Sequence, residues 1–252
     1  MKHRTFPILL ILAFVAAGCA PDGDEPAGEL GGTAASQSTA SQMQVPPTTH
    51  PNTSGSEWQD LFATDLSDAM NSSGVWSWQD GLLTATEDEA IFTEEEYNDF
   101  ILDLEVMFEP EANAGIIVHT SDTDDWIPNS LEIQIGDNYD PASTEDPDVH
   151  ASGAMYGHVS PSEQRISAPG EWNRYTVTAR GDSLWAVVNG ALVSEIDMSE
   201  YESATTNPDG SEIPEWLTTP LAELPTEGHI GLQGKHGESA VYFRNLRIRE
   251  LD

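Results

Sequence analysis

The sequence has 252 residues, of which 44 are acidic and 9 are basic, so its formal net charge at pH 7 is −35. A surface of this sign repels nucleic-acid backbones and anionic lipid headgroups, which argues against nucleic acid as a partner. The acidic residues occur in clusters such as Glu87-Asp88-Glu89, which indicate a solvated surface whose self-repulsion is relieved by salt. The single cysteine excludes an intrachain disulfide, so stability must come from a hydrophobic core.

The first residues have the layout of a bacterial lipoprotein signal. Lys2 and Arg4 precede an apolar stretch too short to remain in a bilayer as a helix, and Ala16-Ala17-Gly18 supplies small residues before Cys19. We therefore expect a signal peptide over 1–18 and a lipid on the Cys19 thiol, with an ordinary secretory signal as the alternative. Because alanine rather than aspartate follows Cys19, the expected location is the cell envelope, anchored in the outer membrane.

Residues 19–56 predict a flexible linker between the lipid and a folded domain. They are rich in Ala, Gly, Ser, Thr, Gln and Pro and contain few large apolar side chains. Such a segment cannot bury enough surface to offset the entropy lost on ordering, so we expect a disordered tether. The remaining residues, 57–252, suit one all-β domain with a sizeable core, which we expect to be a monomer.

The domain shows the alternation of half-buried strands. Over 100–108, every second residue is apolar and shares one face, while Asp103 and Glu105 lie on the other. Two apolar runs flank Asn189-Gly190, a pair that favours a type I′ hairpin turn. There is no convincing amphipathic helix. Many short strands separated by turns predict an all-β sandwich of jelly-roll type.

Two further segments are predicted to be irregular. Arg180-Gly181-Asp182 spells an adhesion tripeptide but is expected to be a turn between strands. The acidic, proline-containing stretch over 200–227 is predicted to be a long loop, and loops of this length in a compact domain are usually functional or mobile.

The segment from Leu131 to Asp137 holds the first candidate site. In a strand, Glu132 and Gln134 project from one face while the intervening apolar residues enter the core. A bulge at Gly136 would return Asp137 to the face of Glu132, and would place two acids near one another. A two-carboxylate glycoside hydrolase needs such a pair, although Gln134 stands between them. The alternative is a solvated polar face on an edge strand.

Six histidines follow the signal region. They are His50, His119, His150, His158, His229 and His236. His50 falls in the predicted linker. His119 and His236 each end an apolar or glycine-containing run, so either could be a base, a metal ligand or a hydrogen-bonded loop residue. The Asp-rich segment 121–125 could offer oxygen atoms to calcium, but it lacks the spacing of a calcium-binding loop.

A series of short motifs points to a known family. In order along the chain they are Asn113-Ala114-Gly115-Ile116-Ile117-Val118-His119, Glu132-Ile133-Gln134-Ile135, Gly153-Ala154-Met155-Tyr156-Gly157, Gly170-Glu171-Trp172-Asn173, Val188-Asn189-Gly190, Gly228-His229-Ile230-Gly231-Leu232-Gln233, His236-Gly237 and Phe243-Arg244-Asn245-Leu246. Over about 57–251 the chain resembles the 3-keto-disaccharide hydrolase domain family. The resemblance implies a concanavalin A-like jelly roll and a carbohydrate partner, either a 3-keto-glycoside or a glycan. This sequence differs from the usual family pattern at Ala114, at His119 and around His236, positions that we expect to touch the cleft.

The chemistry implied by this resemblance needs one base rather than two matched carboxylates. A ketone at C3 acidifies the C2 proton, a base removes it, the C1 substituent leaves, and water adds back. A divalent cation such as calcium could stabilise the enolate oxygen.

The resemblance also suggests roles for individual residues, which together form the expected site. The expected roles are base for Glu132 or His236, sugar binding for Asn113, Gln134 and His119, stacking for Tyr156 and Trp126, and metal binding or leaving-group protonation for Asp137, His119 and His150. The competing interpretations are a non-catalytic carbohydrate-binding module of the same fold and a surface interaction protein that uses the acidic loop.

Overall fold

The computed structural model describes residues 48–70, 74–140, 142–143 and 146–252. The predicted signal peptide, Cys19 and most of the predicted linker lie outside these residues. In the described part, the chain forms thirteen strands and three single-turn 3₁₀ helices, none of which is long and apolar enough to cross a membrane. The expected all-β jelly-roll sandwich is confirmed.

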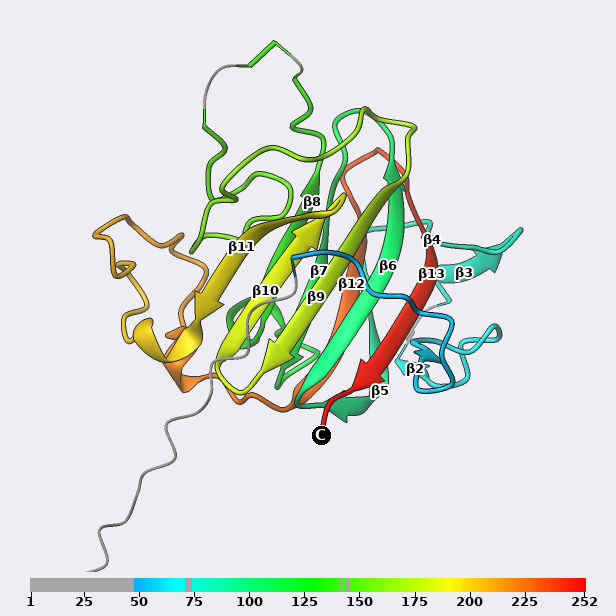
Figure 1. The fold of residues 1–252 in the computed structure, drawn as a ribbon, viewed down its shortest axis with the longest axis horizontal. Helices are drawn as coiled ribbons and strands as arrows, with labels where there is room; N and C mark the ends of the chain where they lie inside the picture. The colour runs from blue at the N-terminus through cyan, green and yellow to red at the C-terminus, as the bar shows by residue number, and fades with distance from the viewer. Residues whose placement is uncertain (1–47, 71–73, 141, 144–145) are drawn as a thin grey trace, which may run out of the picture. The chain divides into compact units, whose positions relative to one another are not determined.

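Two antiparallel sheets face each other across the core (Figure 1). The larger sheet has eight strands in the order β11-β10-β9-β6-β13-β4-β3, with β1 paired to β13. Its strands are β1 (Gln59–Asp60), β3 (Trp76–Gln79), β4 (Leu82–Ala85), β6 (Phe100–Phe108), β9 (Asn173–Arg180), β10 (Ser183–Val188), β11 (Ala191–Asp197) and β13 (Val241–Glu250). The smaller sheet has five strands in the order β2-β5-β12-β7-β8. They are β2 (Ala69–Met70), β5 (Ala90–Tyr97), β7 (Asn113–Thr120), β8 (Leu131–Gly136) and β12 (Gly228–His236).

The core lies between the sheets, where the period-2 alternation of each strand places its apolar residues. In β6, the five apolar residues predicted to share a face are all buried in this core. In β8, Leu131, Ile133 and Ile135 enter the core, so Glu132 and Gln134 point to the outer face of the smaller sheet, as predicted.

Both predicted turns of the larger sheet are confirmed. Asn189 and Gly190 connect β10 to β11 with φ of 45° and 85°, the positive values that a type I′ turn requires. Gly181, in the adhesion-like tripeptide, has φ of 54° and lies in the turn that connects β9 to β10.

The last residues of the predicted linker contact the folded domain. Residues 48–56, blue in Figure 1, pass over the outer face of the larger sheet. Gly190 donates its backbone N–H to His50 Nε2 at 2.8 Å, and His50 Nδ1 lies 2.8 Å from Thr176 Oγ1. Arg174 donates to the carbonyl oxygen of Pro51 at 2.7 Å. His50, expected in the linker, is therefore a contact of the folded domain.

Candidate active site

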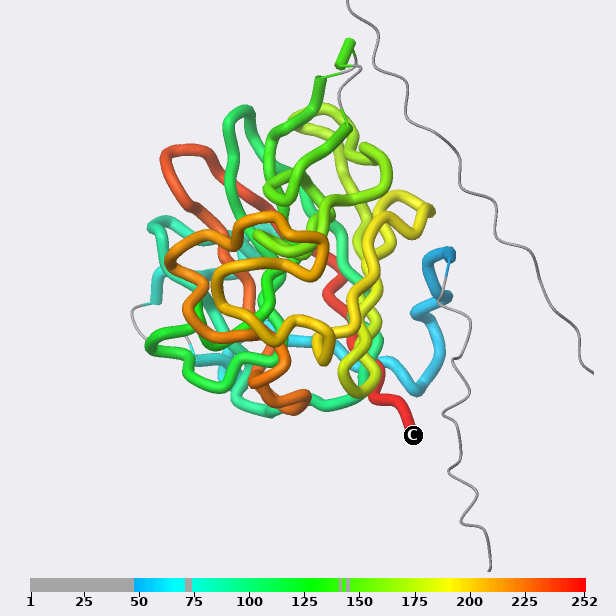
Figure 2. Tube along the Cα trace, turned by 90° about the vertical axis from the view of Figure 1, so that its left-hand side faces the viewer, coloured from blue at the N-terminus to red at the C-terminus, as the bar shows by residue number. Residues whose placement is uncertain are grey.

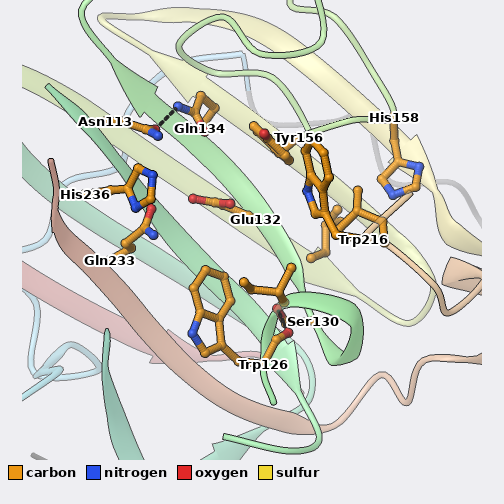
Figure 3. A pocket seen from close by; sticks show the side chains of 13 residues that line it. Asn113, Trp126, Ser130, Glu132, Gln134, Tyr156, His158, Trp216, Gln233 and His236 are labelled. Carbon is orange, nitrogen blue, oxygen red and sulfur yellow. Dashed lines mark hydrogen bonds between the residues drawn. The ribbon is translucent and has the colours of Figure 1, made fainter. Parts of the chain in front are cut away.

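A cleft of about 270 Å³ opens on the outer face of the smaller sheet (Figure 3). Its described lining residues are Asn113, Trp126, Ile127, Ser130, Leu131, Glu132, Gln134, Tyr156, His158, Trp216, Leu217, Gln233 and His236. Strands β7, β8 and β12 supply the floor and the loops that follow or precede them supply the walls. This cleft gathers six of the residues predicted from the sequence: Asn113, Trp126, Glu132, Gln134, Tyr156 and His236.

The register of β7, β8 and β12 fixes the order of the lining residues along the cleft. Passing along the strands, the pairing gives Asn113 beside His236, then Gln134 near Gln233, then Glu132, and then Ser130 just before β8. The period-2 geometry that predicted a shared face for Glu132 and Gln134 is thus the geometry that builds the cleft floor.

Glu132 lies at the centre of the floor without a hydrogen-bond partner for its buried Oε1 atom. Its side chain folds over Gly115 of the neighbouring strand, where a Cβ atom would collide with the carboxyl group. Burial raises the pKa of Glu132 from its ordinary value of 4.5 to about 8. A carboxyl group of this kind is poised to exchange a proton near neutral pH.

Gln134 and Asn113 form an amide pair beside Glu132. Gln134 Nε2 donates to Asn113 Oδ1 at 2.7 Å, while Gln134 Oε1 is buried and has no partner. This bond orients the Asn113 amide so that its Nδ2 group remains as a donor. The pair offers one acceptor and one donor to a polar ligand, which fits the predicted sugar-binding role.

His236 faces Glu132 from the end of β12 and is oriented by an aspartate that the sequence did not single out as a site residue. Its Nδ1 atom lies 2.8 Å from Asp88 Oδ2. Asp88 belongs to the acidic cluster that was interpreted as a solvated surface, and it is 148 residues away in the chain. A carboxylate bonded to Nδ1 holds the imidazole so that Nε2 is the atom left for a ligand.

Aromatic side chains form the walls. Trp126 and Tyr156 were predicted as stacking residues, and both line the cleft. Burial, and secondly the charge of Glu132, raise the pKa of Tyr156. Trp216 is an additional aromatic residue that lies across the cleft in Figure 3, half exposed, and it comes from the acidic loop.

The loop over 200–227 is therefore part of the site. Figure 2 shows it in yellow to orange beside the green segment that carries Tyr156. Asn207 joins the two, because its Nδ2 group donates to the Gly157 carbonyl oxygen at 3.0 Å and its Oδ1 lies 3.0 Å from His158 Nδ1. Burial lowers the pKa of His158. No local pattern in the sequence indicates where a long loop returns to the sheet, so neither Trp216 nor Asn207 could be assigned.

Three predicted site residues do not line the cleft. The pairing of β7 with β8 has no register shift, so the expected bulge at Gly136 is absent, and Asp137 instead accepts a hydrogen bond from the backbone of Glu111 at 2.9 Å. His119 is completely buried, its ring 6.2 Å from that of Phe100, and burial lowers its pKa to about 4. His150 is half exposed and lies edge-on to Tyr156, 5.1 Å between ring centroids.

The predicted metal site is not formed by these residues. In the part of the chain that the structure describes, no three His, Cys, Asp or Glu side chains converge as ligands, so neither Asp137 nor His150 belongs to such a group. Of the positions that differ from the family pattern, Ala114 and His119 are fully buried and do not line the cleft. Only the difference around His236 touches the cleft.

A jelly-roll sandwich with a cleft that combines aromatic walls, an amide pair and one buried carboxyl group defines a carbohydrate-active, glycosyl hydrolase-like protein. The chain belongs to the 3-keto-alpha-glucoside-1,2-lyase-like domain family, whose model matches residues 36–249.

Solved structures agree with this assignment. The chain is 46% identical to a candidate glycosyl hydrolase from Parabacteroides distasonis, with a TM-score of 0.72 over 77% of this chain and 99% of that chain. A second candidate glycosyl hydrolase from the same organism is 22% identical, with a TM-score of 0.56 over 78% of this chain and 89% of that chain, and shares the fold. Among curated proteins, none matches the chain.

Proposed function

We propose that this protein cleaves 3-keto-glycosides by elimination and hydration, with Glu132 as the base that removes the C2 proton. The observation that carries the proposal is the state of Glu132: its Oε1 is buried and has no partner, and it is the one carboxyl group among the described residues that line the cleft. Family membership supports the substrate class, since the family is described as 3-keto-alpha-glucoside-1,2-lyase-like.

The steps conserve atoms and charge with the groups present. Glu132 accepts the C2 proton, the electron pair of that C–H bond forms the C1–C2 double bond, and the C1–O bond breaks. The departing oxygen takes a proton and leaves as an alcohol. Water then adds across the double bond, its oxygen to C1 and a proton to C2, and gives the free 3-keto sugar. A base with a pKa near the working pH is the efficient choice for the first step.

The neighbouring groups suit the remaining tasks. Asn113, oriented by Gln134, would donate a hydrogen bond to the oxygen on which negative charge develops. His236 Nε2, directed by the Asp88 contact to Nδ1, would protonate the leaving oxygen. None of these steps requires a metal ion. Tyr156 and Trp126 would contact the faces of the ligand.

The two alternatives fit the cleft less well. A two-carboxylate glycoside hydrolase would need Asp137 within reach of the bond, but Asp137 lies outside the cleft and is bonded to the Glu111 backbone. A binding module would have no use for a buried carboxyl oxygen without a partner, because leaving such an atom unpaired is costly.

The decisive test uses D₂O. The purified protein is incubated with a 3-keto-α-glucoside and, separately, with the parent α-glucoside, and products are followed at early times by NMR. We expect cleavage of the 3-keto compound alone, with deuterium at C2 of the product. A sample without protein corrects for spontaneous exchange beside the ketone. Cleavage of both compounds with protium retained at C2 would contradict the proposal, and binding without cleavage would favour the module.

The location is proposed from the sequence. A lipid on Cys19 would anchor the domain to the outer membrane of the cell envelope. We expect Cys19→Ser to move the protein from the membrane fraction to the soluble fraction of the envelope. A variant that stays in the membrane fraction would contradict the anchor.

A further inference from the structure

The cleft is divided into a polar half and an apolar half, with Glu132 between them. The polar half holds Asn113, Gln134, Gln233 and His236, which lie toward the end of β8 and β12. The apolar half begins at the start of β8, where the loop that precedes the strand brings Trp126 and Ile127, and the acidic loop adds Trp216 and Leu217. Figure 3 shows Asn113, Gln134, Gln233 and His236 on one side of Glu132, Trp216 with Tyr156 on the other, and Trp126 with Ser130 below.

Two polar side chains of the apolar half already have partners inside the protein. Ser130 Oγ donates to the Trp126 carbonyl oxygen at 2.7 Å, and His158 Nδ1 is held by Asn207 at 3.0 Å. The indole N–H groups can donate but cannot accept. A sugar in this half would bring several hydroxyl hydrogens and meet fewer acceptors than in the polar half, so part of its hydration would be lost without replacement, which is unfavourable.

The apolar half also exposes large side chains to solvent. In the described part of the chain, three large hydrophobic residues are exposed: Ile127 (44%), Tyr139 (38%) and Trp216 (50%). Two of them, Ile127 and Trp216, lie at this half of the cleft. Exposed apolar side chains gathered at the rim of a cleft are typical of a surface that a ligand covers.

We infer that the group released from C1 is an aromatic aglycone, bound between Trp216 and the Trp126–Ile127 corner, and that it is not a second sugar. The inference rests on the proposed function, because it requires C2 of the sugar to lie at Glu132. With that constraint the glycone occupies the polar half, where amides and an imidazole meet its hydroxyls. The C1 substituent then points to the apolar half.

The test compares three substrates that share one 3-keto-α-glucosyl group. Their leaving groups are 2-phenylethanol, methanol and a second glucose, so the aromatic compound has no electronically activated leaving group. We expect kcat/KM for the phenylethyl compound to exceed that of both others by about tenfold or more, on the scale of one buried aromatic contact. A disaccharide preferred over the phenylethyl compound would overturn the inference.

Variants assign the preference to the apolar half. Trp216→Ala and Ile127→Ser should each lower the ratio of kcat/KM for the phenylethyl compound to kcat/KM for the methyl compound several-fold. Tyr139→Ala is the matched control, since Tyr139 is similarly exposed but does not line the cleft. Equal losses on both substrates would contradict the assignment.

A binding measurement separates this inference from the proposed function. The parent phenylethyl and methyl α-glucosides, which lack the ketone, are titrated into the protein by calorimetry. Tighter binding of the phenylethyl compound that Trp216→Ala abolishes supports the aromatic subsite even if no 3-keto-glycoside is cleaved. Equal affinities would overturn the inference whether or not the protein is active.

Discussion

The outer face of each sheet carries a carboxyl group with a buried oxygen atom, and the two groups are in opposite states. On the larger sheet, Asp103 accepts a hydrogen bond from Thr176 Oγ1 at 2.5 Å and from Arg174 Nε at 3.0 Å. On the smaller sheet, Glu132 is partly buried, and its buried Oε1 has no partner. The sequence presents both as acidic residues on the polar face of an alternating strand, so the pattern alone does not distinguish them.

The difference shows which carboxyl group has a structural role and which is kept for a ligand. Burial raises the pKa of both groups, but for Asp103 the contacts with Thr176 and Arg174 oppose the shift, while for Glu132 burial acts alone. A protein gains nothing in stability from an unpaired buried acid. The cost of Glu132 is therefore best explained by what it does when a substrate is bound.

The largest expected effect is on catalysis by Glu132→Gln. The amide has the same shape but cannot accept the C2 proton, so kcat/KM for a 3-keto-glycoside should fall by about 10²- to 10⁴-fold. In the parent protein, the ionisation of Glu132 taken alone should make kcat/KM rise with pH up to about 8, because only the ionised carboxylate is a base. Glu94→Gln, at an exposed position of β5, is the control. Activity within threefold of the parent would remove Glu132 from the mechanism.

Compared with the parent protein, the Glu132→Gln variant should become more stable as pH rises. Below pH 4.5 both the folded and the unfolded chain keep the Glu132 proton, and between 4.5 and about 8 only the folded chain keeps it. The parent therefore loses stability over this range and Glu132→Gln does not. Urea unfolding at pH 5 and pH 8 should show the variant gaining on the order of 3 kcal/mol relative to the parent. A pH-independent difference would mean that Glu132 titrates normally.

In contrast to Glu132→Gln, Asp103→Asn should lower the stability of the fold and change catalytic activity little. It leaves Arg174, whose guanidinium is about one-third exposed, without its carboxylate partner. Breaking a buried pair in this way costs about 3 kcal/mol, reduced here by solvent at Arg174 to roughly 2 kcal/mol. Urea unfolding measures the loss, and kcat/KM at a temperature where the variant is folded should match that of the parent. A large fall in kcat/KM would show that the outer face of the larger sheet influences catalysis on the smaller sheet.

What the sequence predicted and what it missed follow from the range of the interactions. Alternation in β6, the Asn189-Gly190 turn and the shared face of Glu132 and Gln134 depend on residues a few positions apart, and each prediction is confirmed. The contacts that complete the site join residues far apart in the sequence, so they depend on how the whole chain folds. Asp88 reaches His236 from 148 residues away, and no spacing rule distinguishes it from the acidic residues around it.

Asp88→Asn tests whether the contact to His236 matters for activity. Both side chains are about half exposed, so we expect no change in stability. The asparagine holds the imidazole ring less firmly in the orientation that directs Nε2 to the ligand, so kcat/KM should fall by about tenfold. Asp80→Asn, at an exposed turn elsewhere, is the control. If His236→Ala itself leaves kcat/KM unchanged, the histidine has no role and the Asp88 contact is only a surface pair.

The smallest expected effect concerns His50, which adds hydrogen bonds to the outer face of the larger sheet. It is 13% exposed and accepts the Gly190 N–H at Nε2, so its proton is on Nδ1 and points to Thr176. Burial and then the charge of Arg174 lower the pKa of His50 to about 4, although Asp103 lies 3.9 Å away. His50→Ala should lose the two hydrogen bonds and about 1 kcal/mol of stability at pH 7.5.

The pH dependence of that loss distinguishes a pair of hydrogen bonds from simple packing. Between pH 6.5 and about 4 the unfolded chain binds a proton that folded His50 does not, so the parent loses stability as pH falls and His50→Ala loses less. The difference between the two proteins in urea unfolding should therefore shrink from pH 7.5 to pH 5. His119 and His158, whose pKa values are also lowered, are present in both proteins and cancel. His150→Ala, at a half-exposed position, is the control. A difference that stays constant or grows on acidification would show that His50 binds its proton while the segment remains folded on the sheet.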